Sequence, residues 1–212
     1  MKHDHLVFDL DGTISDPREG IVKSFNYALS HHDLPELPEA TIAAHIGPPL
    51  DKTFITLTQN HDKSVIASLV AKYRERYADI GYSENTLYDG VKETLTALRN
   101  QGVRMGICTS KRADFARKIL TLFELDNCFE FINGGDIGIE KWQQLEGLRQ
   151  RYTITQHAVM IGDRAVDLSA AHHNGLQSAG VLWGYGSRKE LEIEHPEYLF
   201  EKPEQLLQLS QQ

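Results

Sequence analysis

Two carboxylates with one residue between them form the first group of side chains that could do chemistry. They are Asp9 and Asp11, and they close an apolar run that begins at Leu6. In an extended strand, side chains two residues apart lie on the same face, so these carboxylates would be held close together. Like charges at that separation resist joint ionisation unless a cation or a shared proton lies between them. The structural alternative is a strand-to-turn junction, because Asp and the following Gly12 are residue types that favour turns.

Polar side chains also follow three later apolar runs, at residues 103–108, 129–133 and 157–161. In chain order, these side chains are Thr109, Ser110 and Lys111, then Lys141, then Asp163 and Asp167. Ligands of open parallel sheets bind at the carboxyl ends of the strands, so one site could collect all of them. Two acids four residues apart at a helix start would lie about one turn apart on one side.

Phosphoryl transfer needs such a set of groups. A carboxylate can attack phosphorus and form an acyl phosphate, and a second acid can protonate the leaving alkoxide and later deprotonate water. Mg²⁺ prefers hard oxygen ligands such as carboxylates. A lysine and a hydroxyl group can balance the charge that develops on the phosphoryl oxygens.

Short apolar runs alternate with helical patterns over most of the chain. We expect strands at residues 6–10, 103–108, 129–133, 157–161 and 178–182. Strands that alternate with helices predict a parallel sheet with helices on both faces. The expected fold class is therefore α/β, with a doubly wound, Rossmann-like core.

One segment interrupts this alternation. Residues 16–85 show no convincing strand and carry two apolar helical faces, which begin at Ile21 and at Val65. We interpret this segment as an inserted helical cap domain. Residues 1–15 and 86–212 then form the α/β core domain.

Composition narrows the classes of function. The chain has 212 residues, of which 41% are hydrophobic, and a net charge of −8. Such a balance predicts no binding of nucleic acid polymers or anionic membranes, and no apolar run approaches the length of a membrane span. The start of the chain does not resemble a signal peptide, and Cys108 and Cys128 do not suggest a disulfide framework. We expect a soluble cytoplasmic protein, with its oligomeric state left open.

Four segments resemble, in order and context, the motifs of the haloacid dehalogenase superfamily. They are DLDGT (9–13), CTSK (108–111), Lys141 and GDRAVD (162–167). The resemblance covers essentially the whole chain, and the helical segment looks like the helical cap of that superfamily. Segments such as IGPPL (46–50) look most like the branch of phosphoglycolate phosphatases and bacterial 5'-nucleotidases.

The resemblance implies roles for the four acids. Asp9 would be the nucleophile and a ligand of Mg²⁺. Asp11 would be the acid and base, and would bind Mg²⁺ through its main-chain carbonyl. Asp163 would bind Mg²⁺ directly or through water, and Asp167 would orient the groups around the ion.

The resemblance also implies a phosphate-binding set. Thr109 would hold the phosphoryl group, with the amide of Ser110 nearby and Gly12 where the backbone can approach a ligand. Lys141 would pair with Asp9 and the phosphate, and it is the only lysine between Lys118 and Lys189.

The expected function is a Mg²⁺-dependent phosphatase that acts on a small phosphorylated metabolite, such as phosphoglycolate or a nucleoside monophosphate, through an aspartyl phosphate. A phosphomutase of the same superfamily is the nearest alternative. A receiver-like domain that accepts phosphate on Asp is an alternative of another class, and a catalytically silent binding protein is a third. Substrate identity is not readable, because the cap supplies specificity.

Several residues have a structural and a functional interpretation. Lys111 is expected to cap charge near a helix start or to be solvated rather than to touch phosphate. A solvated helix face is favoured over a substrate surface for Arg74, Arg76 and Tyr77. A contact with substrate and a purely structural role are both left open for residues 47–49, Trp183 and Tyr185.

Overall fold

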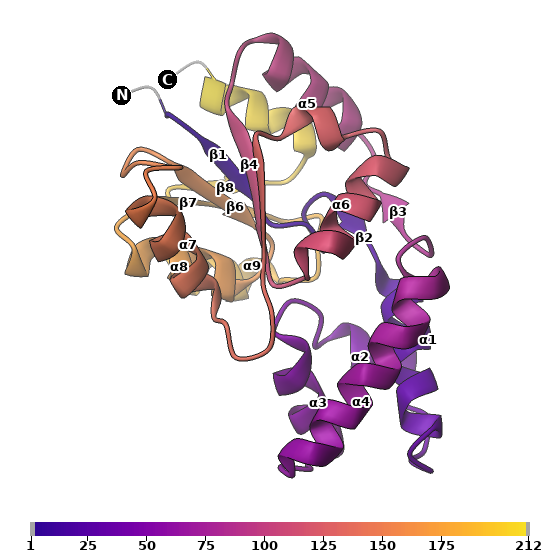
Figure 1. Cartoon of the computed structure of the whole chain (residues 1–212). Helices are drawn as coiled ribbons and strands as arrows, with labels where there is room; N and C mark the ends of the chain where they lie inside the picture. Colours follow the sequence, from indigo (N-terminus) through magenta and orange to yellow (C-terminus); the bar gives the residue numbers. More distant parts are fainter. Residues whose placement is uncertain (1–2, 211–212) are drawn as a thin grey trace.

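The computed structural model describes residues 3–210 and shows a sheet with helices on both faces beside a group of further helices (Figure 1). The sheet has six parallel strands in the order β5-β4-β1-β6-β7-β8. They are β1 (Leu6–Phe8), β4 (Met105–Thr109), β5 (Phe131–Gly134), β6 (Val159–Gly162), β7 (Gln177–Val181) and β8 (Tyr198–Phe200). The predicted doubly wound α/β fold is confirmed.

Strand β1 lies inside the sheet because its sequence is apolar on both faces. Leu6, Val7 and Phe8 are fully buried, and Leu6 lies opposite Met105 of β4 and Val159 of β6. Parallel strands that are covered on both faces read as continuous apolar runs. This strand order brings the carboxyl ends of β1, β4 and β6 side by side at one edge.

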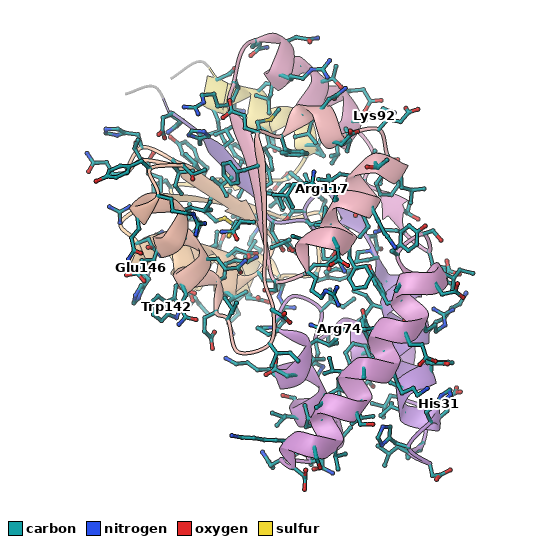
Figure 2. All side chains as sticks on the ribbon, in the orientation of Figure 1. His31, Arg74, Lys92, Arg117, Trp142 and Glu146 are labelled. Atoms are coloured by element: carbon teal, nitrogen blue, oxygen red, sulfur yellow. The ribbon has the colours of Figure 1, made fainter. Side chains whose placement is uncertain are left out.

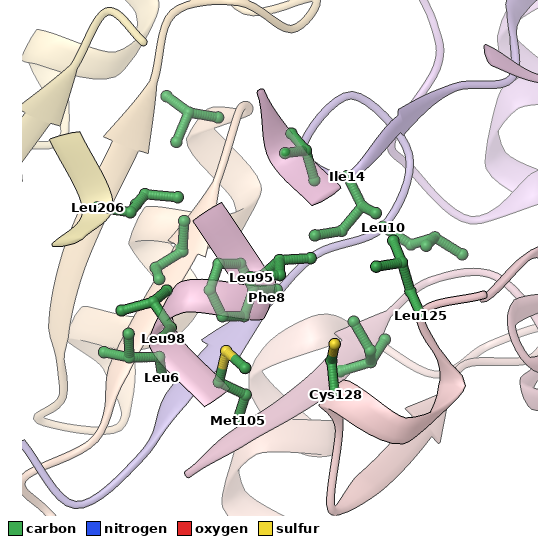
Figure 3. Close-up of a cluster of buried hydrophobic side chains, with 14 of the residues drawn as sticks. Leu6, Phe8, Leu10, Ile14, Leu95, Leu98, Met105, Leu125, Cys128 and Leu206 are labelled. Carbon is green, nitrogen blue, oxygen red and sulfur yellow. The ribbon is translucent and has the colours of Figure 1, made fainter. Parts of the chain in front are cut away.

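Helices cover both faces of this sheet. On one face, Leu6 and Phe8 pack with residues of α5, α6 and the C-terminal 3₁₀-helix η3, several of which Figure 3 shows. On the other face, Val7 packs with residues of α7 and α8, because successive side chains of a strand point to opposite faces. The core helices are α5 (Val91–Asn100), α6 (Ala113–Leu122), η2 (Asp126–Cys128), α7 (Lys141–Gln150), α8 (Ala165–His173), α9 (Arg188–Ile193) and η3 (Pro203–Ser210).

A separate hydrophobic cluster holds together the segment between β1 and β4. Its buried residues include Phe25, Phe54, Leu69 and Tyr73, and Phe115 of α6 also joins it. The helices of this segment are α1 (Arg18–Ser30), α2 (Glu39–Ala43), α3 (Leu50–Thr58), α4 (Lys63–Arg76) and the π-helix η1 (Tyr77–Gly81). The predicted helical cap is therefore present, with its own core, and it packs against the α/β core through α6.

Two short strands that the sequence did not predict lie at the two borders of the cap segment. Strands β2 (Ser15–Asp16) and β3 (Thr86–Leu87) form an antiparallel pair where the chain enters and leaves the cap. A two-residue strand is too short to show a recognisable alternation in the sequence. The domain borders at residues 15 and 86 stay a prediction, and this strand pair lies beside both of them.

The outermost strand β8 and the C-terminal end of β1 also differ from expectation. Strand β8 is not predicted from the sequence, and β1 ends at Phe8 instead of continuing to residue 10. The first strand stops early because the chain turns directly after it, with the Gly12 N–H donating to the Ser15 carbonyl at 2.8 Å. Within residues 3–210 no helix is long and apolar enough to cross a membrane.

Candidate active site

The carboxyl ends of β1 and β6 bring three acids together around one lysine. The side chains of Asp9, Asp163 and Asp167 each offer a carboxylate oxygen within 4.8 Å of the others. Lys141, the first residue of α7, places its Nζ 2.9 Å from Asp9 Oδ1 and also pairs with Asp167. These four side chains are buried. The structure thus assembles the predicted acids and the predicted lysine at the expected edge of the sheet.

The electrostatics of this cluster are dominated by burial and like charge. Burial, together with the like charges of Asp167 and Asp9, raises the pKa of Asp163 well above its usual range. Burial likewise raises the pKa of Asp167 to about 6, although Lys141 opposes the shift. Burial acts against the charge of Lys141, but the attraction of Asp167 and Asp9 outweighs it and raises the pKa of this lysine. Three acids around one ammonium therefore resist joint ionisation, because full ionisation would leave an excess of buried negative charge.

This donor set fits a divalent cation. Mg²⁺ takes hard oxygen ligands and is commonly held by one or two carboxylates, and Asp9 and Asp163 supply them at neighbouring strand ends. A cation there would relieve the repulsion among the acids. Asp167 is less available as a ligand, because it accepts from Lys141 and from the Arg164 N–H at 3.0 Å.

One main-chain donor and one hydroxyl donor fix the orientation of the Asp163 side chain. The Tyr185 N–H donates to its Oδ2 at 2.8 Å, and the Thr13 hydroxyl lies 3.4 Å from its Oδ1. Gly12 has a φ of 88°, and a Cβ there would lie 2.2 Å from Asp163 Oδ2, so no larger residue fits. The N–H of Gly12 is engaged within its own turn, and its role in phosphate binding stays a prediction. The support from Tyr185 and Thr13 was not predicted, because a main-chain donor leaves no sequence pattern and Thr13 is 150 residues from Asp163 in the chain.

Thr109 and Ser110, which are predicted to bind phosphate, lie beside the same acids. Thr109 is the buried last residue of β4, and its Oγ1 accepts from the Lys111 N–H at 3.2 Å. Thr109 and Ser110 line a cavity of about 90 Å³ whose wall also includes Asp9 and Asp11. The structure therefore brings Thr109 and Ser110 together with the acids at one cavity, while the roles of the individual residues stay predictions.

The cap closes the other side of this cavity. Its contribution is largely apolar and consists of Ile21, Phe25, Ile46, Pro48, Pro49, Leu50, Tyr73 and Tyr77, with His45, Thr53 and Arg74 as polar members. Residues 47–49, which the sequence left open, thus face the cavity. Trp183 and Tyr185 do not line it; the Trp183 Nε1–H donates to the Thr13 carbonyl at 3.0 Å, and the Tyr185 hydroxyl bonds to Asp16.

The expectation of solvated side chains is wrong at four positions. The side chain of Arg76 is 18% exposed and pairs with Glu84 at 2.8 Å. The side chain of Lys111 is 7% exposed and lies 2.8 Å from Asp11 Oδ2. Tyr77 is 1% exposed, and Arg74, labelled in Figure 2, pairs with Asp136 of the core at 2.6 Å. Helical periodicity alone misses these contacts, because the partners lie outside the helix itself.

Comparison with known proteins gives a consistent picture. A family model described as haloacid dehalogenase-like hydrolase matches residues 6–181. A 5'-nucleotidase of Pseudomonas aeruginosa is 36% identical over 92% of this chain and 90% of the relative. Tyrosine-protein kinase PtkA of Mycobacterium tuberculosis is also 36% identical, over 85% of this chain and 62% of the relative. The crystal structure of a predicted phosphatase from Clostridium acetobutylicum superposes with a TM-score of 0.92, at 31% identity, and each chain covers 98% of the other.

These matches confirm the resemblance inferred from the four motifs and the class of enzyme that it implied, a phosphatase. Both kinds of name in the predicted branch, 5'-nucleotidase and phosphoglycolate phosphatase, occur among the relatives. The matched region includes both strands that carry the acids and the whole cap segment. The chain belongs to the haloacid dehalogenase-like hydrolase family.

Proposed function

We propose that the protein is a Mg²⁺-dependent phosphatase that hydrolyses a small phosphomonoester through an aspartyl phosphate on Asp9. The observation that carries this proposal is the convergence of Asp9, Asp163 and Asp167 on Lys141 in a buried cluster, with Asp11 beside it at the cavity wall. A reaction that builds negative charge on phosphoryl oxygens needs such preorganised positive groups next to the nucleophile.

In the first step, an Asp9 carboxylate oxygen attacks phosphorus while the bond to the ester oxygen breaks. Asp11 gives a proton to the departing alkoxide, and burial favours its protonated form because it raises the pKa of this carboxyl group. In the second step, Asp11 takes a proton from water, which attacks the phosphorus of the aspartyl phosphate and frees Asp9. Lys141 holds Asp9 in place through the 2.9 Å contact.

Asp9, Asp163 and the main-chain carbonyl of Asp11 would hold Mg²⁺, with Asp167 fixing Lys141 and the loop at Arg164. The bound ion would supply positive charge to the phosphoryl oxygens. Thr109 and Ser110 line the same cavity, and the hydroxyl of Thr109 and the amide of Ser110 would receive the remaining phosphoryl oxygens.

The proposed substrate is a small phosphorylated metabolite, of the phosphoglycolate or nucleoside monophosphate type. The cap side of the cavity is aromatic and aliphatic, with Phe25, Tyr73 and Tyr77 among its residues. Such a lining suits a leaving group with an apolar surface. A cytoplasmic location is part of this proposal, and the two free, buried cysteines are compatible with a reducing compartment.

A panel of phosphomonoesters tests the proposed function. Phosphoglycolate, nucleoside 5'-monophosphates, sugar phosphates and p-nitrophenyl phosphate are incubated with the protein in Mg²⁺ and, separately, in EDTA. We expect release of inorganic phosphate from at least one ester, and we expect EDTA to abolish that release. A phosphomutase would instead consume the ester without stoichiometric phosphate, and full turnover in EDTA would exclude the metal-dependent reaction.

A further inference from the structure

Lys111 connects the acid Asp11 to the cap. It lies two residues beyond β4, and its Nζ is 2.8 Å from Asp11 Oδ2 and 2.9 Å from the Tyr77 hydroxyl. The same ammonium lies 4.4 Å from the centroid of the Tyr77 ring, which adds a cation–π contact. A single buried cation therefore contacts both the acid of the core and an aromatic residue of the cap.

The position of Tyr77 is tightly determined by its neighbours. Its ring stacks on Tyr73 with centroids 5.4 Å apart, and it meets Phe115 of α6 edge-on at 5.2 Å. Tyr77 opens the π-helix η1, which continues directly from α4. Single-turn π-helices are frequent at functional sites, and here the wider turn lies where the cap reaches Lys111.

The two oxygens of the Asp11 carboxyl group have different surroundings. Oδ2 is paired with Lys111, whereas Oδ1 is buried and has no hydrogen-bond partner within residues 3–210. A general acid must bring one oxygen within about 2.6–3.2 Å of the leaving oxygen. The contact with Lys111 leaves Oδ1 available for that purpose and restricts rotation of the carboxyl group.

We propose that Lys111 is a positioning residue that orients Asp11 for proton transfer, and that Tyr77 couples this orientation to closure of the cap. The inference rests on the proposed function, in which Asp11 is the acid and base. In the closed cap, Tyr77 holds the Lys111 ammonium against Asp11 Oδ2, and Oδ1 faces the leaving oxygen. Cap opening withdraws the hydroxyl and the ring of Tyr77, so Asp11 loses its fixed orientation when water can enter.

The test uses two aryl esters that differ in leaving group, phenyl phosphate and p-nitrophenyl phosphate, in Mg²⁺. The measured quantity is kcat/KM, which reports the first chemical step. Misplacing a catalytic group by about 1 Å can cost about 10²-fold, so we expect Lys111→Met to lower kcat/KM for phenyl phosphate by about 10- to 100-fold. The loss should be clearly smaller for p-nitrophenyl phosphate, because its leaving group needs little protonation. Tyr77→Phe should show the same pattern at smaller size, and Lys111→Arg should recover part of the loss.

Matched controls separate this effect from general damage. Lys92→Met removes an exposed cation on α5 that is paired with Glu124 (Figure 2), and Tyr152→Phe removes the hydroxyl of a tyrosine that is 91% exposed. Both controls should leave kcat/KM for the two esters unchanged. Thermal melting of each variant in Mg²⁺ checks that the fold is retained, and Lys111→Arg keeps the test decisive if Lys111→Met does not fold.

The outcomes distinguish the inference from the function on which it rests. Equal losses on both esters in Lys111→Met would overturn the positioning role and assign Lys111 to substrate binding or to structure. A normal ratio of the two esters in Tyr77→Phe would overturn the coupling to the cap. If Asp11→Asn itself lowers both esters equally, the acid role of Asp11 fails, and with it the proposed mechanism. A strong leaving-group effect in Asp11→Asn without one in Lys111→Met would reject only the inference about Lys111.

Discussion

Two sets of charged contacts in this molecule use the same residue types in opposite surroundings. At the strand ends, the side chains of Lys141, Asp9 and Asp167 are 1%, 4% and 1% exposed. Between cap and core, a group of contacts that we call the seam consists of Arg74–Asp136, Lys52–Glu140 and Arg164 with the Ile46 carbonyl. The seam side chains Arg74 and Asp136 are 24% and 55% exposed.

Exposure determines what each set of contacts can do. Charges in a buried cluster interact strongly and cannot be exchanged for water, so the cluster keeps one geometry but strains the fold when negative charge is in excess. Exposed pairs contribute about 0–1 kcal/mol and are screened by salt. The seam can therefore open and close at little cost, while the buried cluster stays assembled. This difference suits an enzyme whose cap opens to admit substrate while the buried cluster of catalytic side chains keeps its geometry.

The largest expected effect separates the two regions by activity. Asp9→Asn keeps the shape of the side chain but removes the attacking carboxylate, so we expect a loss of about 10⁴-fold or more for every ester. Asp136→Asn makes the same chemical change in the seam. Asp136 lines the cavity but lies outside the buried cluster of acids, so this variant should lower kcat far less than Asp9→Asn does. Initial rates at saturating Mg²⁺ measure both. Similar losses from both variants would contradict the division between a catalytic cluster and a reversible seam.

The second prediction concerns the thermal stability of Asp163→Asn, whose change in Tm should have opposite signs with and without metal. Asp163→Asn removes a carboxyl group whose ionisation burial and the neighbouring acids oppose, and it retains an oxygen that can accept from the Tyr185 N–H. In EDTA we expect its Tm to exceed that of the unchanged protein by about 2–4 °C, which corresponds to about 1 kcal/mol.

Excess Mg²⁺ should reverse the order of these two melting temperatures. Metal that binds only the folded state adds about 2.7 kcal/mol at a hundredfold excess over its Kd, and the variant should gain much less. Asp114→Asn, at an exposed acid paired with Arg112, serves as the control. Its Tm should match that of the unchanged protein both in EDTA and in excess Mg²⁺. A Tm that falls in EDTA for Asp163→Asn would show that the cluster is not strained.

The smallest expected effect concerns the seam. A double-mutant cycle of Arg74→Gln and Asp136→Asn, measured by chemical unfolding, should give a coupling free energy of about 0.5 kcal/mol. The coupling should decrease as salt shortens the range of the interaction. A salt-independent coupling of about 2 kcal/mol or more would instead indicate a cap that is locked onto the core.

The strand ends of the core were predictable because the signals are local. The apolar run of β1 followed by Asp9 and Asp11, and the run of β6 followed by Asp163, place acids at known positions in the chain. The right-handed parallel topology then brings them to one edge. The structure assembles these acids as the sequence predicts.

The seam and the surroundings of Lys111 were not predictable for the opposite reason. Lys111 and Tyr77 are separated by 34 residues and belong to different domains, so neither motif nor periodicity links them. Strands β2 and β3 were not predictable either, because two residues are too few to show an alternation of apolar and polar side chains. Contacts that depend on how the cap lies on the core follow from packing, which a single sequence encodes only indirectly.

Chemical trapping of the phosphoryl group tests directly whether the reaction passes through a phosphorylated Asp9. Asp11→Asn retains the nucleophile Asp9 but lacks the base for the second step, so it is mixed with p-nitrophenyl phosphate and Mg²⁺ and quenched in acid within one turnover. We predict that intact mass rises by one phosphoryl group and that peptide mapping places it on Asp9, with no modification in Asp9→Asn. Release of p-nitrophenol in a single turnover without any phosphorylated protein would contradict the account, because water would then attack the ester directly.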